Sequence, residues 1–342
     1  MKLSHEIVAL RTKNPFVIAR GGSSEYRVVR ITITAPDGST GWGEAAPSAF
    51  YGETADTVVD VLPLLANALK GADAWSLEAC EHALAKVIRF NGAARAGVSA
   101  ALHDLIGKRL GVPVYRLWGL DPAACPLTSF TIGIAPDEAT LRSRVADAEQ
   151  YPVLKIKLGS MWDERIVRVV RELAPNKILR VDANAGWNPK HTLRMVPILQ
   201  ELGVEFVEQP LHPGDIEGLR FVRERSSLPI IADESCIVSG DIPKLAGVVD
   251  GINIKLAKCG GLREALRMVA VARAHDMLVM AGCMIESSLG ITAAAHFAPL
   301  LDCADYDGHA LISNDPYTGA TIGDGVIRLP DGPGLGVEYR TA

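Results

Sequence analysis

VLKIKL, residues 153–158, is the stretch that decides the fold, because it is an apolar run interrupted only by two lysines. Short apolar runs recur after it, and each ends in one charged residue: Asp182, Glu208, Asp233 and Lys255. Counted from Lys157, the successive gaps are 25, 26, 25 and 22 residues, the length of one strand followed by one helix. In a barrel of parallel strands, the carboxyl ends of the strands meet at one mouth. The sequence therefore predicts that five charged strand ends converge there.

The chain after Gly119 alternates between short β-branched runs and helical stretches. Amphipathic stretches such as 163–173, 190–202 and 262–274 predict helices. Strand–helix alternation at this spacing favours class α/β and a (β/α)-barrel, a modified TIM barrel. An open doubly wound sheet would carry a glycine-rich phosphate loop, whereas Gly260-Gly261 is only a tight turn before a helix. The runs predicted to be strands are 127–134, 153–158, 178–181, 204–207, 230–232, 251–254 and 278–281.

The first third of the chain has a different pattern and predicts an N-terminal α+β capping domain. The runs 28–35 and 40–45 flank the turn sequence Pro36-Asp37-Gly38 and predict a hairpin, followed by helices over 54–70, 76–90 and 93–108. The tail is rich in glycine and proline, and we expect it to fold back and complete the capping domain. The predicted division is residues 1–118 for the cap, 119–320 for the barrel and 321–342 for the tail.

Composition narrows the class of protein. Hydrophobic residues make up 48% and charged residues 22% of the chain, which is the balance of a globular protein with a sizeable core. A net charge of -5 without a basic run gives no reason to expect nucleic acid as a partner. No apolar run of membrane-spanning length and no signal peptide is recognised. Six cysteines without a CxxC pair predict reduced thiols and a cytoplasmic location. We expect a homo-oligomer, as is common for barrels with a capping domain.

Three of the predicted strand-end residues are carboxylates, and they predict a metal site. Asp182, Glu208 and Asp233 would repel one another strongly at one barrel mouth without a cation. Hard oxygen ligands of this kind suit Mg²⁺, which keeps coordination positions for water and substrate. Removing a proton next to a substrate carboxylate builds negative charge that a divalent ion stabilises. We therefore expect one Mg²⁺ per subunit.

The lysines predict the kind of proton transfer. Lys155 and Lys157 are two residues apart, so both point to the same side of their strand and repel each other as cations. That repulsion, together with burial and a nearby metal, favours the neutral amine that a base requires. Lys255 approaches from across the barrel and faces the other side of the substrate. A lysine on each face permits 1,1-proton transfer, or epimerisation; the alternative role for the Lys155 and Lys157 pair is purely structural charge.

Together these motifs resemble the enolase superfamily, and more narrowly its muconate lactonizing enzyme subgroup. The resemblance covers nearly the whole chain and rests on segments 154–158, 181–184, 207–210, 232–235 and 253–256, with 41–44 and 282–286. It implies that Asp182, Glu208 and Asp233 bind Mg²⁺ and that Lys157 and Lys255 are the acid–base pair. Lys155 would contact the substrate carboxylate.

Within that subgroup the chain is most similar to dipeptide epimerases of the L-Ala-D/L-Glu type. Asp305 and Asp307 stand where the last barrel strand should end, and two carboxylates at this spacing could bind the free ammonium of a dipeptide. Residues 15–21 and 51–53 resemble the loops that close over substrate in these enzymes. The resemblance also implies that Thr131, Cys283, Met284 and Ile285 line the dipeptide site.

One departure leaves the side-chain preference open. Epimerases of Ala-Glu present an arginine from the first loop to the glutamate side chain, and this chain has Ser23 at that position, with Arg20 nearby. A neutral or hydrophobic second residue is therefore credible. Two other functions remain open: an o-succinylbenzoate synthase or muconate-type cycloisomerase, and a non-catalytic barrel that binds a carboxylate ligand.

Overall fold

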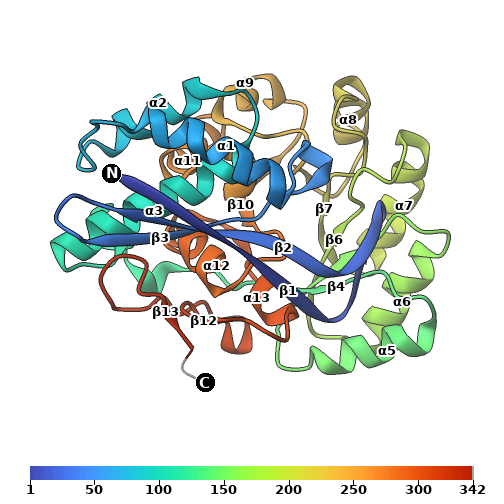
Figure 1. Cartoon of the computed structure of the whole chain (residues 1–342). Helices are drawn as coiled ribbons and strands as arrows, with labels where there is room; N and C mark the ends of the chain where they lie inside the picture. Colours follow the sequence, from blue (N-terminus) through green and yellow to red (C-terminus); the bar gives the residue numbers. More distant parts are fainter. Residues whose placement is uncertain (341–342) are drawn as a thin grey trace.

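The computed structural model describes residues 1–340, and its first part is an antiparallel sheet covered by helices (Figure 1). β1 (Lys2–Ile18) pairs with β2 (Gly21–Thr34), which pairs with β3 (Thr40–Ala45). Val29, Ile31 and Ile33 alternate along β2 and pack on one side of the sheet against α1 (Ala55–Ala68), α2 (Leu77–Val87) and α3 (Gly92–Leu110). The hairpin and the three helices predicted for this part are confirmed, with ends shifted by a few residues.

β1 was not predicted from the sequence. Its residues are mostly exposed, and Leu10 is its only core residue that is completely buried. An edge strand with one solvent-exposed face has few apolar residues. Its alternation of apolar and polar residues is therefore weak, and its sequence resembles that of a loop. The consequence is that the capping sheet has three strands and not two.

Eight parallel strands follow in chain order, and each pairs with the next: β4 (Phe130–Ile132), β5 (Val153–Lys157), β6 (Ile178–Asp182), β7 (Val204–Glu208), β8 (Ile230–Ala232), β9 (Gly251–Ile254), β10 (Leu278–Gly282) and β11 (Cys303–Asp305). A bridge between Thr128 and Ala304 joins the two outer strands of this sheet. The predicted (β/α)-barrel is confirmed. β11 was not among the runs predicted to be strands, but it ends at Asp305, where the last barrel strand was expected to end.

Helices surround the barrel (Figure 1). Two helices have the predicted bounds, α6 (Asp163–Leu173) and α11 (Leu262–Ala274). The other α-helices are α4 (Val114–Leu117), α5 (Glu138–Asp147), α7 (Pro189–Glu201), α8 (Ile216–Arg223), α9 (Ile242–Leu245), α10 (Leu256–Cys259), α12 (Ser288–Ala295) and α13 (Gly308–Leu311). Single 3₁₀ turns are η1 (Ala49–Tyr51), η2 (Pro122–Ala124), η3 (Ser239–Asp241), η4 (Ala298–Leu300) and η5 (Gly323–Gly325). Among residues 1–340, no helix combines the length and the apolarity that a bilayer crossing requires.

The tail returns to the capping domain. β12 (Tyr317–Thr318) pairs with β13 (Glu338–Tyr339), and the Tyr339 ring lies edge-on to Trp42 with 5.0 Å between ring centroids. The backbone N–H of Leu335 donates to Asp104 Oδ1 on α3 at 2.8 Å. The tail therefore contacts β3 and α3 of the capping domain; Figure 1 shows β12 and β13 at the lower left.

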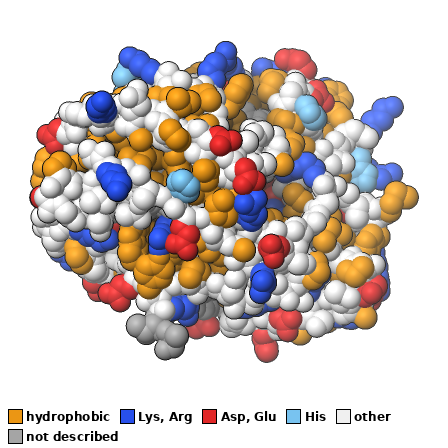
Figure 2. Space-filling view, in the orientation of Figure 1, with side chains coloured by type: hydrophobic (Ala, Val, Ile, Leu, Met, Phe, Trp, Pro, Cys, Tyr) orange, Lys and Arg blue, Asp and Glu red, His pale blue; other side chains and the backbone are white. Residues whose placement is uncertain are grey.

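The molecular surface on the side seen in Figure 2 carries both positive and negative side chains. In Figure 2, lysine and arginine side chains are interspersed with aspartate and glutamate, and hydrophobic side chains lie between them. The six cysteines are all free thiols.

Candidate active site

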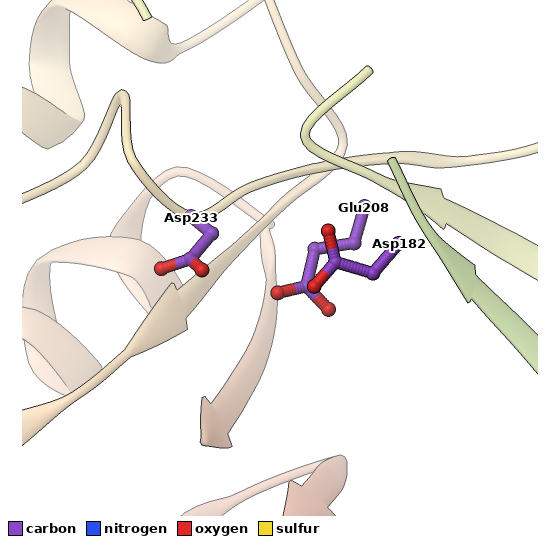
Figure 3. A group of neighbouring side chains, drawn as sticks. All are labelled: Asp182, Glu208 and Asp233. Carbon is purple, nitrogen blue, oxygen red and sulfur yellow. The ribbon is translucent and has the colours of Figure 1, made fainter. Parts of the chain in front are cut away.

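Three carboxylates meet at the carboxyl ends of neighbouring barrel strands (Figure 3). Asp182 ends β6, Glu208 ends β7, and Asp233 directly follows β8. One oxygen from each carboxylate lies within 4.8 Å of the others, and all three side chains are buried. The structure therefore brings the predicted metal ligands together.

The pKa values of this group show why it suits a cation. Burial pushes the pKa of Asp182 upward, but the ammonium groups of Lys157 and Lys155 outweigh burial and lower it to about 2. For Glu208, burial and the adjacent Asp182 and Asp233 carboxylates raise the pKa to about 7. A carboxyl group whose charge is opposed by its like-charged neighbours gains most from a shared cation.

Neighbouring amides hold the carboxylates in place. Asn253 Nδ2 donates to Glu208 Oε1 at 2.7 Å, and the backbone N–H of Asn184 donates to Asp182 Oδ1 at 2.8 Å. Each of these two carboxylates thus has its orientation fixed from one side. Three fixed, buried oxygen donors fit a small hard ion such as Mg²⁺.

Lysines lie on both sides of the carboxylate group. Lys157 Nζ is 2.6 Å from Asp182 Oδ2, and Lys255 Nζ is 2.8 Å from Asp233 Oδ2. Lys157 ends β5, whereas Lys255 follows β9, four strands further round an eight-stranded barrel. The two amines therefore approach from opposite sides of the barrel, as the strand order predicted.

Lys155 points into the barrel beside Lys157, but carboxylates and not lysine–lysine repulsion dominate its surroundings. Its Nζ lies 2.7 Å from Glu208, 2.9 Å from Asp305 and 3.3 Å from Asp182. Burial lowers the pKa of Lys155, yet these carboxylates raise it well above the usual value. The same balance of burial against Asp233 raises the pKa of Lys255. Both shifts favour the ammonium form, the reverse of the neutral amine that was expected from lysine–lysine repulsion and burial.

Lys258 is a site residue that sequence reasoning missed. Its buried Nζ donates to Asp233 Oδ1 at 2.5 Å and to the carbonyl oxygens of Asp233, Cys236 and Asn253 at 2.6, 3.0 and 2.9 Å. It fixes the far side of Asp233 while Lys255 holds the near side. The only sequence signal was its position three residues after Lys255, and a lysine in a short helix is normally solvated.

A cavity of about 280 Å³ lies between the capping domain and the barrel mouth. Lys157 and Lys255 both line this cavity. Most of the predicted substrate contacts also line it: Arg20, Thr131, Cys283, Met284, Ile285, Asp305 and Asp307. Tyr51, from the second of the two loops expected to close over substrate, lines it as well. Asn184 and Glu234 join them without having been predicted as substrate contacts.

Asp305 and Asp307 share this cavity, but their pKa values are shifted in opposite directions. Asp305 Oδ1 accepts from Ser129 Oγ at 2.7 Å, and burial of the carboxyl is outweighed by Lys155, so its pKa is lowered. Asp307 Oδ2 accepts from the backbone N–H of Thr131 at 2.6 Å. Burial and the nearby Asp305 raise the pKa of Asp307 to about 7. A cation placed between these two carboxyls would therefore favour ionisation of both.

The two candidates from the first loop lie in different places. Arg20 sits at the turn between β1 and β2, and its Nη1 lies 2.7 Å from Glu234 Oε1 and 2.6 Å from the carbonyl oxygen of Asn184. Ser23 is exposed on β2, and its hydroxyl donates to the carbonyl oxygen of Glu25 at 2.8 Å. Ser23 is not among the residues that line the cavity, although Gly21 before it and Tyr26 after it are.

The fold and this site together define a class: a (β/α)-barrel with a capping domain, a triad of strand-end carboxylates and lysines facing each other across the mouth. Residues 3–119 match the family model of the mandelate racemase / muconate lactonizing enzyme N-terminal domain. Residues 138–342 match the enolase C-terminal domain-like model. The chain therefore belongs to the mandelate racemase / muconate lactonizing enzyme family of the enolase superfamily, and the predicted resemblance is confirmed.

Individual relatives are similar over nearly the full length. The L-Ala-D/L-Glu epimerase of Bacteroides thetaiotaomicron is 39% identical over 98% of this chain and 88% of its own. The hydrophobic dipeptide epimerase of Roseobacter litoralis is 40% identical over 98% of each chain. A dipeptide epimerase from Cytophaga hutchinsonii, solved with Mg and D-Ala-L-Val, superposes with a TM-score of 0.93 at 28% identity, covering 99% of this chain and 96% of that one. These relatives are epimerases, which agrees with the predicted isomerase.

Proposed function

We propose that this chain is a Mg²⁺-dependent dipeptide epimerase that inverts the α-carbon of the C-terminal residue. The observation that carries this proposal is the placement of Lys157 and Lys255 on opposite sides of one carboxylate triad, in a cavity that also holds Asp305 and Asp307. Opposed amines are what a two-base reaction needs, and a pair of carboxylates is what a free ammonium needs. The names of the relatives point to the same substrate class.

The substrate would span the cavity between two groups of residues. Its N-terminal ammonium would lie between Asp305 and Asp307, whose side chains are otherwise held by Lys155 and Thr131. Its C-terminal carboxylate would lie toward the triad and Lys155. This orientation places the α-carbon of the second residue between Lys157 and Lys255.

Proton transfer would then run from one face of that carbon to the other. One lysine takes the α-proton, and the lysine on the opposite face returns a proton, so the configuration inverts. Asp182, Glu208 and Asp233 would hold one Mg²⁺, which supplies positive charge next to the substrate carboxylate as negative charge develops there. Lys155 adds a second cation at the same carboxylate.

The test is solvent exchange at the α-carbon. Purified protein with Mg²⁺ in D₂O is incubated with a panel of L,L-dipeptides, and ¹H NMR follows loss of the C-terminal α-proton and appearance of the L,D-diastereomer. We expect both for at least one dipeptide, loss of both on EDTA treatment, and recovery with added Mg²⁺. Absence of exchange across the whole panel would contradict the proposal.

The cycloisomerase and the non-catalytic alternatives are separated by the two carboxylates. Substrates of the cycloisomerases carry no ammonium, so Asp305→Asn and Asp307→Asn should impair only a dipeptide enzyme. Each carboxylate lines the cavity, which favours the dipeptide. Mg²⁺-dependent binding of dipeptides without exchange would favour the non-catalytic barrel instead.

A further inference from the structure

We infer that the side chain of the epimerised residue enters an uncharged, largely apolar subsite, so that dipeptides ending in an apolar residue are preferred over those ending in glutamate or aspartate. This inference rests on the proposed epimerase function and names the substrate class of the same site. It follows from the position that side chain must take, from the cations around the cavity, and from the way the first loop is held.

The geometry of the reacting carbon fixes where its side chain points. When the α-proton has been removed, the carbon is planar, and the lysines lie above and below that plane. Two of the three in-plane directions are taken, one by the carboxylate toward the triad and one by the peptide nitrogen toward Asp305 and Asp307. The third direction leads out of the barrel, toward the capping residues Ile18, Ala49 and Tyr51 that cover the cavity.

Among residues 1–340, four cationic residues line this cavity: Arg20, Arg27, Lys157 and Lys255. The lysines belong to the reacting centre, so a substrate carboxylate in the side-chain subsite would have to pair with an arginine. The question is therefore whether either guanidinium is free.

Arg27 faces away from the cavity. Its neighbours Tyr26 and Val28 pack toward Ile285, whereas Arg27 lies on the opposite face of β2, because successive side chains alternate along a strand. Its guanidinium pairs with Asp56 on α1 through two hydrogen bonds of 2.8 and 3.0 Å. Arg27 therefore contributes backbone to the cavity wall and no charge.

Arg20 does face the barrel mouth, but it is already paired. Glu234, its partner at 2.7 Å, has a side chain that is only 1% exposed, and Arg20 is the cation that pairs with it directly, while Lys255 acts on it from further away. The guanidinium also donates to the carbonyl oxygen of Asn184 and stacks on the Phe50 ring at 4.1 Å. Moving Arg20 to a substrate would leave Glu234 buried without its cation.

The backbone next to Arg20 is held as firmly. Ala19 lies against Gly159 and Gly186, the residues that follow β5 and β6. A side chain on Gly186 would come within 2.9 Å of the Ala19 Cβ, and one on Gly159 within 2.4 Å. This fit holds the first loop against the barrel mouth, and the ion pair between Arg20 and Glu234 holds it there as well.

Much of the remaining cavity wall is apolar, with Ser48 and Tyr51 as polar residues on the side of the capping domain. Phe16, Ile18 and Val28 come from the hairpin, and Ile285 and Leu311 come from the barrel. An unpaired carboxylate among these side chains would lose its hydration without gaining a partner, whereas a leucine or methionine side chain would gain apolar contact.

The experiment compares near-isosteric substrates. Initial rates of α-proton exchange in D₂O give kcat/KM for L-Ala-L-Glu, L-Ala-L-Gln, L-Ala-L-Met and L-Ala-L-Leu. We expect kcat/KM for L-Ala-L-Met and L-Ala-L-Leu to exceed that for L-Ala-L-Glu by about tenfold or more. A value for L-Ala-L-Glu equal to or above the others overturns the inference while leaving the epimerase function intact. Failure of every dipeptide in the panel overturns the epimerase function itself.

Variants distinguish a structural role of Arg20 in holding the first loop from a contact between Arg20 and the substrate. Arg20→Gln should lower kcat/KM for all four dipeptides by a similar factor, and Arg27→Gln should leave their ratios unchanged. Selective loss of L-Ala-L-Glu turnover in either variant would overturn the inference. Arg225→Gln is the matched control, because Arg225 also stacks on a phenylalanine, at 4.0 Å, and pairs with a glutamate, at 3.1 Å, but lies beyond α8 and away from the cavity. The wild-type panel decides the matter even if Arg20→Gln does not fold.

Discussion

At the scale of single residues, the two opposed lysines make a distinctive prediction about exchange. Replacing Lys157 or Lys255 by methionine removes the base from one face only. Each variant should lose epimerisation by about 10³-fold or more, yet still exchange the α-proton of one diastereomer with solvent through the remaining lysine. The two variants should exchange opposite diastereomers. ¹H NMR in D₂O, started separately from the L,L- and L,D-dipeptide, measures this, and equal exchange of both diastereomers by one variant would contradict a two-base arrangement.

Lys258 makes a second residue-scale prediction. Four buried oxygen atoms accept from its Nζ, so Lys258→Met removes one hydrogen bond from each of them. We expect a loss of about 3–5 kcal/mol in the free energy of unfolding, the range for breaking a buried ion pair. Mg²⁺ affinity should also fall, since Asp233 loses its far support. Urea denaturation and calorimetric titration with Mg²⁺ test both effects. Lys244→Met, at an exposed position, is the control, and an unchanged Mg²⁺ affinity would show that Asp233 does not need Lys258.

At the scale of elements, the sequence predicted the parts of the site that repeat and missed those that do not. Charged residues at a spacing near 25 identify the ends of β5 to β9, because the barrel itself repeats at that length. Lys258, Glu234 and Asn184 follow no period, and their roles depend on three-dimensional contacts. β1 was missed since an edge strand buries little apolar surface. Ser23 stays a prediction: its hydroxyl donates to the carbonyl oxygen of Glu25 within β2, a local contact that the sequence could not show.

The contact between the first loop and the barrel gives an element-scale prediction. Gly186→Ala would place a methyl group within 2.9 Å of both the Ala19 Cβ and the Ala183 carbonyl oxygen, so the loop must lift. We expect KM for dipeptides to rise about tenfold, equivalent to ~1.4 kcal/mol of binding, with a smaller change in kcat. Gly240→Ala, where no atom lies within 4 Å, should leave both constants unchanged. Steady-state kinetics decide, and an unchanged KM in Gly186→Ala would mean that the loop does not rest on these glycines during turnover.

At the scale of the whole molecule, one buried carboxyl joins the capping domain to the barrel. Glu44, at the end of β3, accepts from the backbone N–H of Ser287 at 2.9 Å and also contacts its hydroxyl. Ser287 follows Cys283, Met284 and Ile285, which line the cavity. The contact therefore ties the orientation of the cap to the wall of the site. Burial, together with the neighbouring Glu286 carboxyl, raises the pKa of Glu44 to about 8.

That raised pKa predicts how stability depends on pH. Between about pH 4.5 and 8 the folded state binds a proton at Glu44 that the unfolded chain releases, so the free energy of unfolding falls as pH rises through this window. Glu44→Gln cannot titrate, and its amide can replace the protonated carboxyl against Ser287. We therefore expect the stability of wild type relative to Glu44→Gln to fall with rising pH, by up to about 1.4 kcal/mol per unit, and to level off above pH 8.

Chemical denaturation from pH 5 to 9 in EDTA measures this difference without a contribution from bound metal. Glu286, whose pKa burial raises to about 7, remains in both proteins, so its own slope largely cancels. Glu217→Gln is the control, because that side chain is 85% exposed and should give no pH-dependent difference from wild type. If the difference between wild type and Glu44→Gln were constant over the whole range, Glu44 would be ionised in the fold, and the cap would be joined to the barrel through a charged carboxylate.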